Sequence, residues 1–438
     1  SPISQKSGKP TQAALNLKEL ITEFIAVHDL SILAIIWTSV FFASFIAHRT
    51  RLTPVLWYLF LGSTLVNLGM LPTQMPIFIL NFAELGIITI MFALGFEEDT
   101  SNFLKSIKRS WGIAVFGALT PFAVAYSATF YFWGDKHIAL LCGLAMASTT
   151  VSLSMVSLKT EGLSHTPAAT GIMTSAVLDN IASLALMVIL IPIAVGEATF
   201  SLHSLLLIAG KALGFFLIVS FMGIWLFPVN AGWVKRVPII RHFNLKLMLA
   251  MGRGEYSILA LLLIALLVGL LADFFGFHPA IGAYMAGLII KREYFDYHHD
   301  QKIDFHDQAK QMINNIAFAW VGPVFFVTLG TKLIFDADLF LQVLPYSLIL
   351  FVGMFIGQIV SAGLAARTIG HFDKPTSLLI GFGMLGRAEL AFVVLEIAYV
   401  QHNIVSLESF YTLMLTAFLL NLSVPICIRW WKTHYLPT

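Results

Sequence analysis

The sequence predicts an all-α protein that crosses a membrane many times. Of its 438 residues, 58% are hydrophobic and 11% are charged, and the mean hydropathy is +0.84. Soluble domains usually carry about 25% charged residues. The apolar residues also gather in runs of about 20, the length that a helix needs to cross a bilayer. Composition and run length together therefore predict a polytopic membrane protein with about 13 transmembrane helices.

The chain divides into a polar start, a long apolar region and a short tail. Residues 1–28 are expected to form a polar tail with a short lead-in helix over 17–28, and no apolar core follows a basic start as in a signal peptide. Residues 29–432 form the predicted transmembrane domain, and 433–438 form a C-terminal tail.

Thirteen apolar runs are bounded by charges, prolines or glycines. The ninth is short, and Gly276 separates it from the eighth. In order the runs cover residues 31–47, 54–70, 77–95, 111–133, 137–158, 166–195, 203–227, 256–275, 278–290, 312–330, 340–366, 376–401 and 408–431.

The distribution of basic residues predicts an N-out, C-in orientation. If alternate loops face alternate sides, most of the 26 Lys and Arg residues fall on the side of the first loop and the C-terminus. Basic loops remain preferentially in the cytoplasm. The other side holds Lys6, Lys9, Lys18, Lys136 and Lys332.

Charge and cysteine usage exclude several classes of protein. The net charge of +2 comes from basic residues spread over loops, so no nucleic-acid partner is expected. Cys142 and Cys427 both lie in apolar runs, which gives no disulfide or zinc framework. No triad, intramembrane protease carboxylate pair or metal-binding helix motif is evident, so no catalytic residue and no enzyme activity is predicted.

The run TSAVLDNIASLAL places Asp179 and Asn180 within the sixth span. A carboxylate there costs several kcal/mol unless a partner, a cation or a proton compensates it, so the default hypothesis is a functional site. A structural Asp that caps a helix break is the alternative. Burial disfavours the charged form of a carboxyl group, which suits a residue that alternates between a proton and a cation.

Other polar residues within spans require partners. Arg387 and Glu389 are two residues apart and cannot share one helical face. Glu84 is predicted to pair with Arg387, since a paired, inward-facing arrangement is the least costly for intramembrane charges. These three residues are interpreted mainly as structural core charges.

Two spans carry sequences that favour a break in the helix. The fifth contains Ala147-Ser-Thr-Thr-Val-Ser152, and the twelfth contains Gly381, Gly383 and Gly386. Paired interruptions in the two halves of a chain point to a transporter site and an inverted repeat. The glycines match G-x-G-x-x-G, but they follow no strand, so a nucleotide site is rejected. Thr149, Thr150 and Gln358 are candidate ion ligands, although each could serve only in hydrogen bonds within the helices.

A predicted cytoplasmic loop is rich in acidic and histidine residues. A solvated linker is the favoured interpretation, with pH sensing or adventitious metal binding as alternatives. Its residues are Asp296, His298, His299, Asp300, Asp304, His306 and Asp307.

Five segments together resemble the monovalent cation:proton antiporter-2 family, which includes sodium/proton exchangers and Kef-type potassium efflux proteins. They are LTPVLWYLFLG, FAELGIITIMFALGFEED, GFHPAIGAYMAGLII, WVGPVFFVTLG and GMLGRAELAFVVLEIA, in this order. The resemblance spans residues 30–431. It implies thirteen spans, with core spans near 77–195 and 311–402 and a dimerisation or scaffold part built from the remaining spans. In the mobile core, two broken helices would cross beside the sixth span.

The resemblance also implies an ion site with two departures from the family pattern. Electrogenic relatives carry Asp-Asp, Kef-type relatives Gln-Asp and electroneutral exchangers of the sister family Asn-Asp, whereas this chain has Asp179-Asn180. The position of a family lysine holds Gln358. A second alignment places Asp179 itself on the ion-binding position. We expect Asp179 to bind the ion, with Asn180, Thr149 or Thr150 and backbone carbonyls as neutral ligands, since oxygen ligands suit hard cations.

The sequence therefore predicts an electroneutral secondary transporter of the elevator type that exchanges protons for Na⁺ or K⁺. No cofactor and no other metal site are expected, and the partners are the ions, the bilayer and a second copy in a homodimer. The expected location is a bacterial inner membrane. A non-transporting membrane sensor of the same fold and an organic-ion transporter are the alternative functions.

Overall fold

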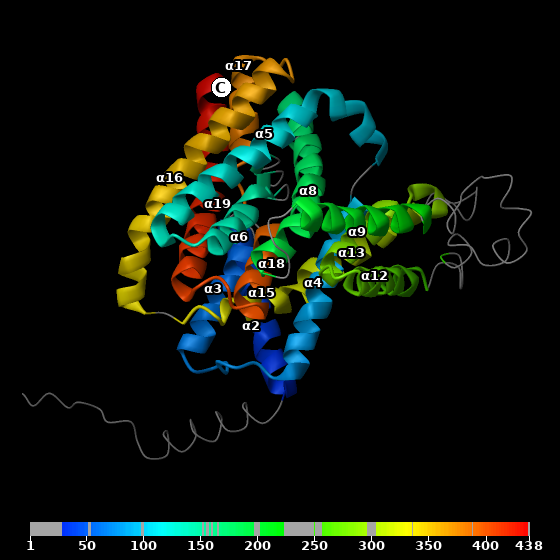
Figure 1. Ribbon diagram of the computed structural model, residues 1–438, viewed down its shortest axis with the longest axis vertical. Coiled ribbons are helices and arrows are strands. Elements are labelled where there is room, and N and C mark those ends of the chain that lie inside the picture. Colours follow the sequence, from blue (N-terminus) through cyan, green and yellow to red (C-terminus); the bar gives the residue numbers. More distant parts are fainter. Residues whose placement is uncertain are drawn as a thin grey trace, which may run out of the picture.

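The computed structural model describes residues 29–50, 54–97, 100–150, 153–154, 157–158, 161–163, 166–196, 202–222, 249, 256–295, 304–334, 336–387 and 389–436. All regular structure in these residues is helical (Figure 1). The helices of the first half are α2 (Asp29–Thr50), α3 (Pro54–Asn67), α4 (Ile77–Glu97), α5 (Thr100–Trp133), α6 (Lys136–Ala147), α8 (Pro167–Ala194) and α9 (Leu202–Phe221). The second half contains α12 (Ser257–Phe274), α13 (Pro279–Ile289), η4 (Arg292–Phe295), α14 (Phe305–Asn315), η5 (Ile316–Trp320), α15 (Gly322–Gly330), α16 (Ala337–Thr368), α17 (Lys374–Gly383), α18 (Glu389–Leu395), η6 (Glu396–Gln401) and α19 (Leu407–Tyr435).

Local sequence signals account for where several helices begin. Asp135 accepts hydrogen bonds from the first backbone N–H groups of α6, and Asp373 and Ser406 do the same for α17 and α19. Thr166 caps α8 and is followed by Pro167. These are favoured residue types, because a side-chain oxygen satisfies an N–H that lacks a partner in the helix, and proline needs no N–H there.

The outside of the fold is apolar, as a bilayer requires. Within the described residues, seven helices are long and apolar enough to cross a membrane, and further apolar helices are shorter. Large hydrophobic side chains are exposed along α2, α12 and α16, including Phe41, Leu267 and Ile356. Every predicted span coincides with at least one helix, and Gly276, with φ +82°, separates α12 from α13 as expected. The predicted lead-in helix over 17–28 lies outside the described residues.

Two helices are interrupted where the sequence predicted breaks. Helix α6 ends at Ala147, and Ser148 is extended, with φ −79° and ψ 143°. Helix α17 ends at Gly383, and the non-helical residues 384–387 precede α18. Each break exposes backbone groups that no longer pair within a helix, which is tolerated inside a membrane protein only where other protein groups or a cavity receive them.

The helices pack into two groups. One comprises α2, α3, α4, α12, α13, α14 and α15, and the other comprises α5, α6, α8, α16, α17, α18 and α19, with α9 beside α8 and α13. Figure 1 places α5, α16, α17 and α19 in one part of the molecule and α12 and α13 in another. We call these groups the scaffold group and the core group. Helices α4 and α15, expected within the core near 77–195 and 311–402, pack with the scaffold group, whereas α19 packs with the core group.

Candidate ion-binding site

The two helix breaks lie against each other in the core group. The backbone N–H of Thr150 donates to the carbonyl of Gly386 over 3.0 Å. The hydroxyl of Ser154 donates to the carbonyl of Gly383, across the same contact. Each break therefore receives backbone groups that the other leaves without helical partners, which stabilises two non-helical segments inside the membrane.

Asp179 lies beside this crossing, in the middle of α8, and is fully buried. Its Oδ2 accepts hydrogen bonds from both the backbone N–H and the hydroxyl of Thr149, each at 2.8 Å. Its Oδ1 has no hydrogen-bond partner in the part of the chain that the structure describes. One oxygen of the carboxyl group is thus fixed by the broken helix, and the other remains available to a proton or a cation.

Arg387 is the second buried charge of the core. Its Nη2 donates to Oε1 of Gln358 at 2.6 Å, and its Nε donates to the carbonyl of Met146 at 2.7 Å. Its Nη1 donates to three carbonyls of the twelfth-span break, those of residues 384, 385 and 386. Carbonyl and amide dipoles therefore solvate the guanidinium in place of water. Arg387 interacts electrostatically with Asp179 without forming a direct ion pair.

The predicted Glu84–Arg387 ion pair is wrong. Glu84 is exposed on α4 in the scaffold group, and Arg387 is fully buried in the core group. Among the described residues, the guanidinium donates its hydrogen bonds to amide and carbonyl oxygens. Sequence reasoning assumed that a carboxylate was the least costly partner, whereas the break in the twelfth span supplies several unpaired carbonyls at the arginine itself.

Gln358 takes the hydrogen-bonding role that was the alternative to ion ligation. Its Oε1 accepts from Arg387, and its Nε2 is a donor, so the side chain holds the arginine and is not placed as a cation ligand. Thr149 donates a hydrogen bond to Asp179, and Thr150 contributes its backbone N–H to the crossing. The side chains of Asn180 and Glu389 lie outside the described part of the structure.

Asn421 was missed by sequence reasoning. Its Oδ1 accepts from the backbone N–H of Arg387 at 2.7 Å, and its Nδ2 donates to the carbonyl of the same residue at 2.6 Å. This amide replaces the helical partners that the break removes, and so fixes the backbone at the arginine. The available signal was a lone Asn within the apolar run LTAFLLNLSVP, on a helix that had not been assigned to the core.

A cavity of about 480 Å³ lies between the groups, at the end of α8. Its lining includes Glu84, Asp273, His278 and Gln401, together with Met187 and other apolar residues of α8. An adjoining hollow of about 190 Å³ shares Glu84 and adds Glu396 of η6. The side chains of His278 and Gln401 lie 3.1 Å apart, so polar groups of the scaffold and core meet here. Glu84 therefore belongs to this cavity, which we call the vestibule.

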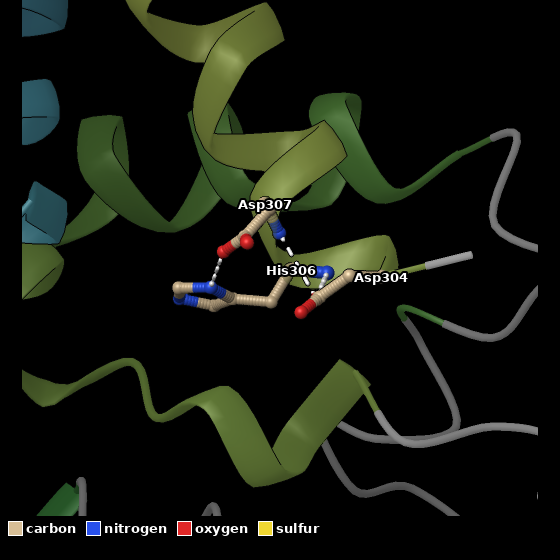
Figure 2. A group of neighbouring side chains, drawn as sticks. All are labelled: Asp304, His306 and Asp307. Carbon is tan, nitrogen blue, oxygen red and sulfur yellow. Dashed lines mark hydrogen bonds and ion pairs between the residues drawn. The ribbon is translucent and has the colours of Figure 1, made fainter. Parts of the chain in front are cut away.

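The acidic and histidine-rich loop is described only from Asp304 onward. Figure 2 shows Asp304, His306 and Asp307 at the start of α14, where Asp304 accepts from the backbone N–H groups of the other two. Arg292 forms an ion pair with Asp304, and the ring of His306 packs against Phe96. The cluster caps a helix and anchors it to α4, so its oxygen atoms serve local structure. His298 and His299 lie outside the described residues.

Comparison with known proteins places this architecture in a family. The profile described as "Sodium/hydrogen exchanger, transmembrane" matches residues 36–431. The chain belongs to the sodium/hydrogen exchanger family. The resemblance predicted from five sequence segments is therefore confirmed, and the family comprises transporters, not enzymes.

Two named antiporters and one solved structure resemble this exchanger-family chain over most of its length. A protein of Enterococcus hirae named "Na(+)/H(+) antiporter" is 24% identical over 401 residues, covering 92% of this chain and 97% of that protein. The "Na(+)/H(+)-K(+) antiporter GerN" of Bacillus cereus is 27% identical over 312 residues, covering 71% and 73%. The solved sodium proton antiporter MjNhaP1 of Methanocaldococcus jannaschii superposes with a TM-score of 0.63 at 13% identity, covering 91% and 98%. This likeness establishes the fold.

Proposed function

We propose that this chain exchanges protons for a monovalent cation, Na⁺ or K⁺, and that Asp179 binds both in turn. The observation that carries the proposal is the buried carboxyl group at the meeting of two broken helices, with one oxygen held by Thr149 and the other without a partner. A buried carboxylate is costly unless something neutralises it, and a proton or a small cation does so equally. Relatives named as Na⁺/H⁺ and Na⁺/H⁺-K⁺ antiporters support this choice of ions.

The neighbouring groups supply oxygen ligands to a cation at Asp179. The Thr149 hydroxyl donates its hydrogen to the carboxylate, and its lone pairs remain available to a cation. Carbonyl oxygens of the breaks, the Thr150 hydroxyl and the Asn180 amide complete the proposed set. Oxygen donors of this kind suit hard monovalent ions, and the count and spacing of the ligands would decide between Na⁺ and K⁺.

Competition for one carboxylate leads to electroneutral exchange. Arg387 is fixed and positive, so the buried pair of Arg387 and Asp179 is neutral when Asp179 is empty and ionised. Adding either a proton or a monovalent cation raises its charge by one. The core therefore carries the same charge with either ion, and exchange of one for the other moves no net charge.

The packing suggests how the site reaches both sides of the membrane. Each half of the chain contributes helices to both groups, and each half contributes one broken helix to the core. This symmetry supports an inverted repeat, and the apolar runs and basic loops of the sequence support thirteen spans with the N-terminus out and the C-terminus in. We propose that the core group moves against the scaffold group in an elevator-type cycle, and that scaffold groups of two copies form a homodimer in a bacterial inner membrane.

The vestibule supports cation entry at one stage of that cycle. Glu84 and Asp273 line it, and Glu396 adds a carboxyl group in the adjoining hollow, with Lys332 near Glu396. A cleft with excess acidic groups raises the local concentration of cations.

Proton flux in sealed proteoliposomes tests the proposal. Wild-type protein should acidify or alkalinise the lumen when Na⁺ or K⁺ is added to one side, and choline should have no effect. Asp179→Asn should abolish the flux while the protein remains folded in detergent. Retained exchange in Asp179→Asn would overturn the assignment, and no flux in the wild type with any cation would favour a different solute or a sensor.

A further inference from the structure

Three polar residues recur at four-residue intervals on α8: Ser175, Asp179 and Ser183. This spacing places them on one face of the helix. Ser175 and Asp179 are 0% exposed, and Ser183 is 2% exposed. Among the described residues, the two serine hydroxyls and Asp179 Oδ1 make no hydrogen bond. The carboxyl group is therefore flanked, one helical turn away on each side, by a buried hydroxyl without a partner.

Several buried hydroxyl groups of the described helices, on α8 and elsewhere, donate to their own helix backbone, although Thr328 on α15 does not. Thr174, the neighbour of Ser175 on α8, donates to the carbonyl of Thr170 at 3.0 Å, and Thr129 donates to that of Ala125 at 2.6 Å. The bond to the preceding turn is the ordinary solution for Ser and Thr in a membrane helix. A buried hydroxyl without a partner has lost its hydrogen bonds to water, so a ligand that engages it recovers part of that loss.

Ser183 differs from Ser175 in what lies beyond it. The same face of α8 continues through Met187 and Ile191, which line the vestibule. Ser183 thus lies between the buried carboxyl group and the cavity, with Met187, only 1% exposed, as the next side chain. The Ser183 hydroxyl is close enough to the carboxyl group of Asp179 to act on it as a weak hydrogen-bond donor, although the pair falls short of hydrogen-bond geometry.

We propose that Ser183 is a ligand of the transported cation and the first side-chain oxygen of α8 that the ion meets between the vestibule and Asp179. The inference rests on the proposed function of Asp179. Its hydroxyl oxygen can coordinate a cation that occupies Asp179 Oδ1, and can accept a hydrogen bond from that oxygen when the carboxyl group is protonated. One side chain thereby stabilises both loaded states of the site.

The test measures cation affinity separately from turnover. In proteoliposomes, Ser183→Ala should raise the KM for Na⁺ or K⁺ about tenfold, which corresponds to about 1.4 kcal/mol, and change the maximal rate much less. In detergent, Ser183→Ala should also reduce the rise in melting temperature that the same cation produces in the wild type. Thr174→Val removes a hydroxyl that the backbone already satisfies, and should keep both values within about twofold of the wild type.

Further variants distinguish the possible failures. Ser183→Cys is close in size and offers a soft sulfur, a poor ligand for hard cations, so it should weaken cation binding even if Ser183→Ala does not fold. Wild-type KM and thermal shift in the folded Ser183 variants, with exchange still abolished in Asp179→Asn, would overturn the role of Ser183 and leave the proposed function intact. Exchange retained in Asp179→Asn would overturn both.

Discussion

Arg387 illustrates how a buried charge is stabilised without a counterion in contact. Its guanidinium meets the amide oxygen of Gln358 and the carbonyls of two helix breaks. A hydrogen bond to a charged group contributes about 1.5–3 kcal/mol, and several act here together. The fixed positive charge then contributes to the electrostatics of Asp179, which makes the structural role of Gln358 and the ion chemistry of Asp179 interdependent.

Gln358→Leu should therefore destabilise the protein, whereas Glu84→Gln should not. Removing the amide oxygen leaves a donor of Arg387 without a partner and should cost about 1.5–3 kcal/mol. Glu84 forms no ion pair in the described structure, so its neutral replacement should leave the melting temperature within about a degree of the wild type. Melting curves of both purified variants give the comparison. A larger loss of stability in Glu84→Gln than in Gln358→Leu would contradict the assignment of Gln358, and not Glu84, as the partner of Arg387.

The Thr149 hydroxyl has a separate, testable role. It donates one of the two hydrogen bonds that hold Asp179 Oδ2. Thr149→Val keeps the shape and the backbone bond but removes this donor, so we expect exchange to fall by about tenfold or more, since bonds to charged groups contribute about 1.5–3 kcal/mol. Thr149→Ser retains the hydroxyl and should retain most activity. Equal rates in the two variants, measured by proton flux, would exclude a role for the hydroxyl.

At the scale of the single residue, the sequence revealed Asp179 because a carboxylate in an apolar run has few structural explanations. It did not reveal the partners of Arg387 or the hydroxyl of Ser183. Serine is common in membrane helices, and only its burial without a hydrogen bond distinguishes Ser183 from Thr174. That property depends on the neighbouring helices, which no local pattern encodes.

At the scale of the element, the breaks in α6 and α17 were predictable from local sequence. Hydroxyl residues follow Ala147, and glycines precede Arg387, so both segments favour non-helical backbone. Gly386 meets a steric need as well, because a Cβ there would lie 2.7 Å from Cγ2 of Thr150. The two hydrogen bonds between Asn421 and the backbone of Arg387 were not predictable, because Asn421 lies on α19, far along the chain.

The crossing of α4 and α13 depends on close backbone contact. A Cβ at Gly287 would lie 2.4 Å from the carbonyl oxygen of Phe92, and one at Gly95 would lie 2.1 Å from that of Tyr284. Small residues allow membrane helices to approach closely. Gly287→Ala should therefore separate the helices and lower stability by about 1–3 kcal/mol.

Gly210 of α9 provides the matched control for that prediction. A Cβ at Gly210 would meet no described atom within 4 Å. Gly210→Ala should leave stability unchanged or raise it by about 0.5–1 kcal/mol, because alanine favours the helix. Thermal unfolding of the two variants side by side checks the contrast, and a Gly287→Ala protein as stable as the wild type would contradict the packing of α4 on α13.

At the scale of the whole molecule, the sequence predicted the helices better than their grouping. Hydrophobic runs indicate the length and the boundaries of each helix, and the run over 278–290 predicted the short helix α13 (Pro279–Ile289). The same runs do not report which helix contacts which. Helices α4, α15 and α19 lie in groups other than those expected, because grouping follows close approaches such as Gly62 against Val327, between residues far apart in the chain.

The charge carried by the whole core is the property that decides how exchange responds to membrane voltage. In the mechanism proposed above, one titrating carboxyl group at Asp179, beside the fixed charge of Arg387, would give the loaded core the same net charge with a proton or a cation. Exchange driven by an ion gradient should therefore proceed at the same rate with the membrane potential clamped at zero or set to about 100 mV, although such a potential contributes about 2.3 kcal/mol per charge moved.

The same comparison of two membrane potentials should be made with Asn180→Asp, because this variant places a second carboxyl group next to Asp179. If both groups then exchange protons for one cation, net charge moves and the rate should depend on the potential. Voltage-independent flux in the wild type, together with voltage-dependent flux in Asn180→Asp, would establish that a single carboxyl group sets the stoichiometry. Voltage dependence in the wild type itself would mean that another group in the core titrates during the cycle, and the one-carboxylate mechanism would be wrong.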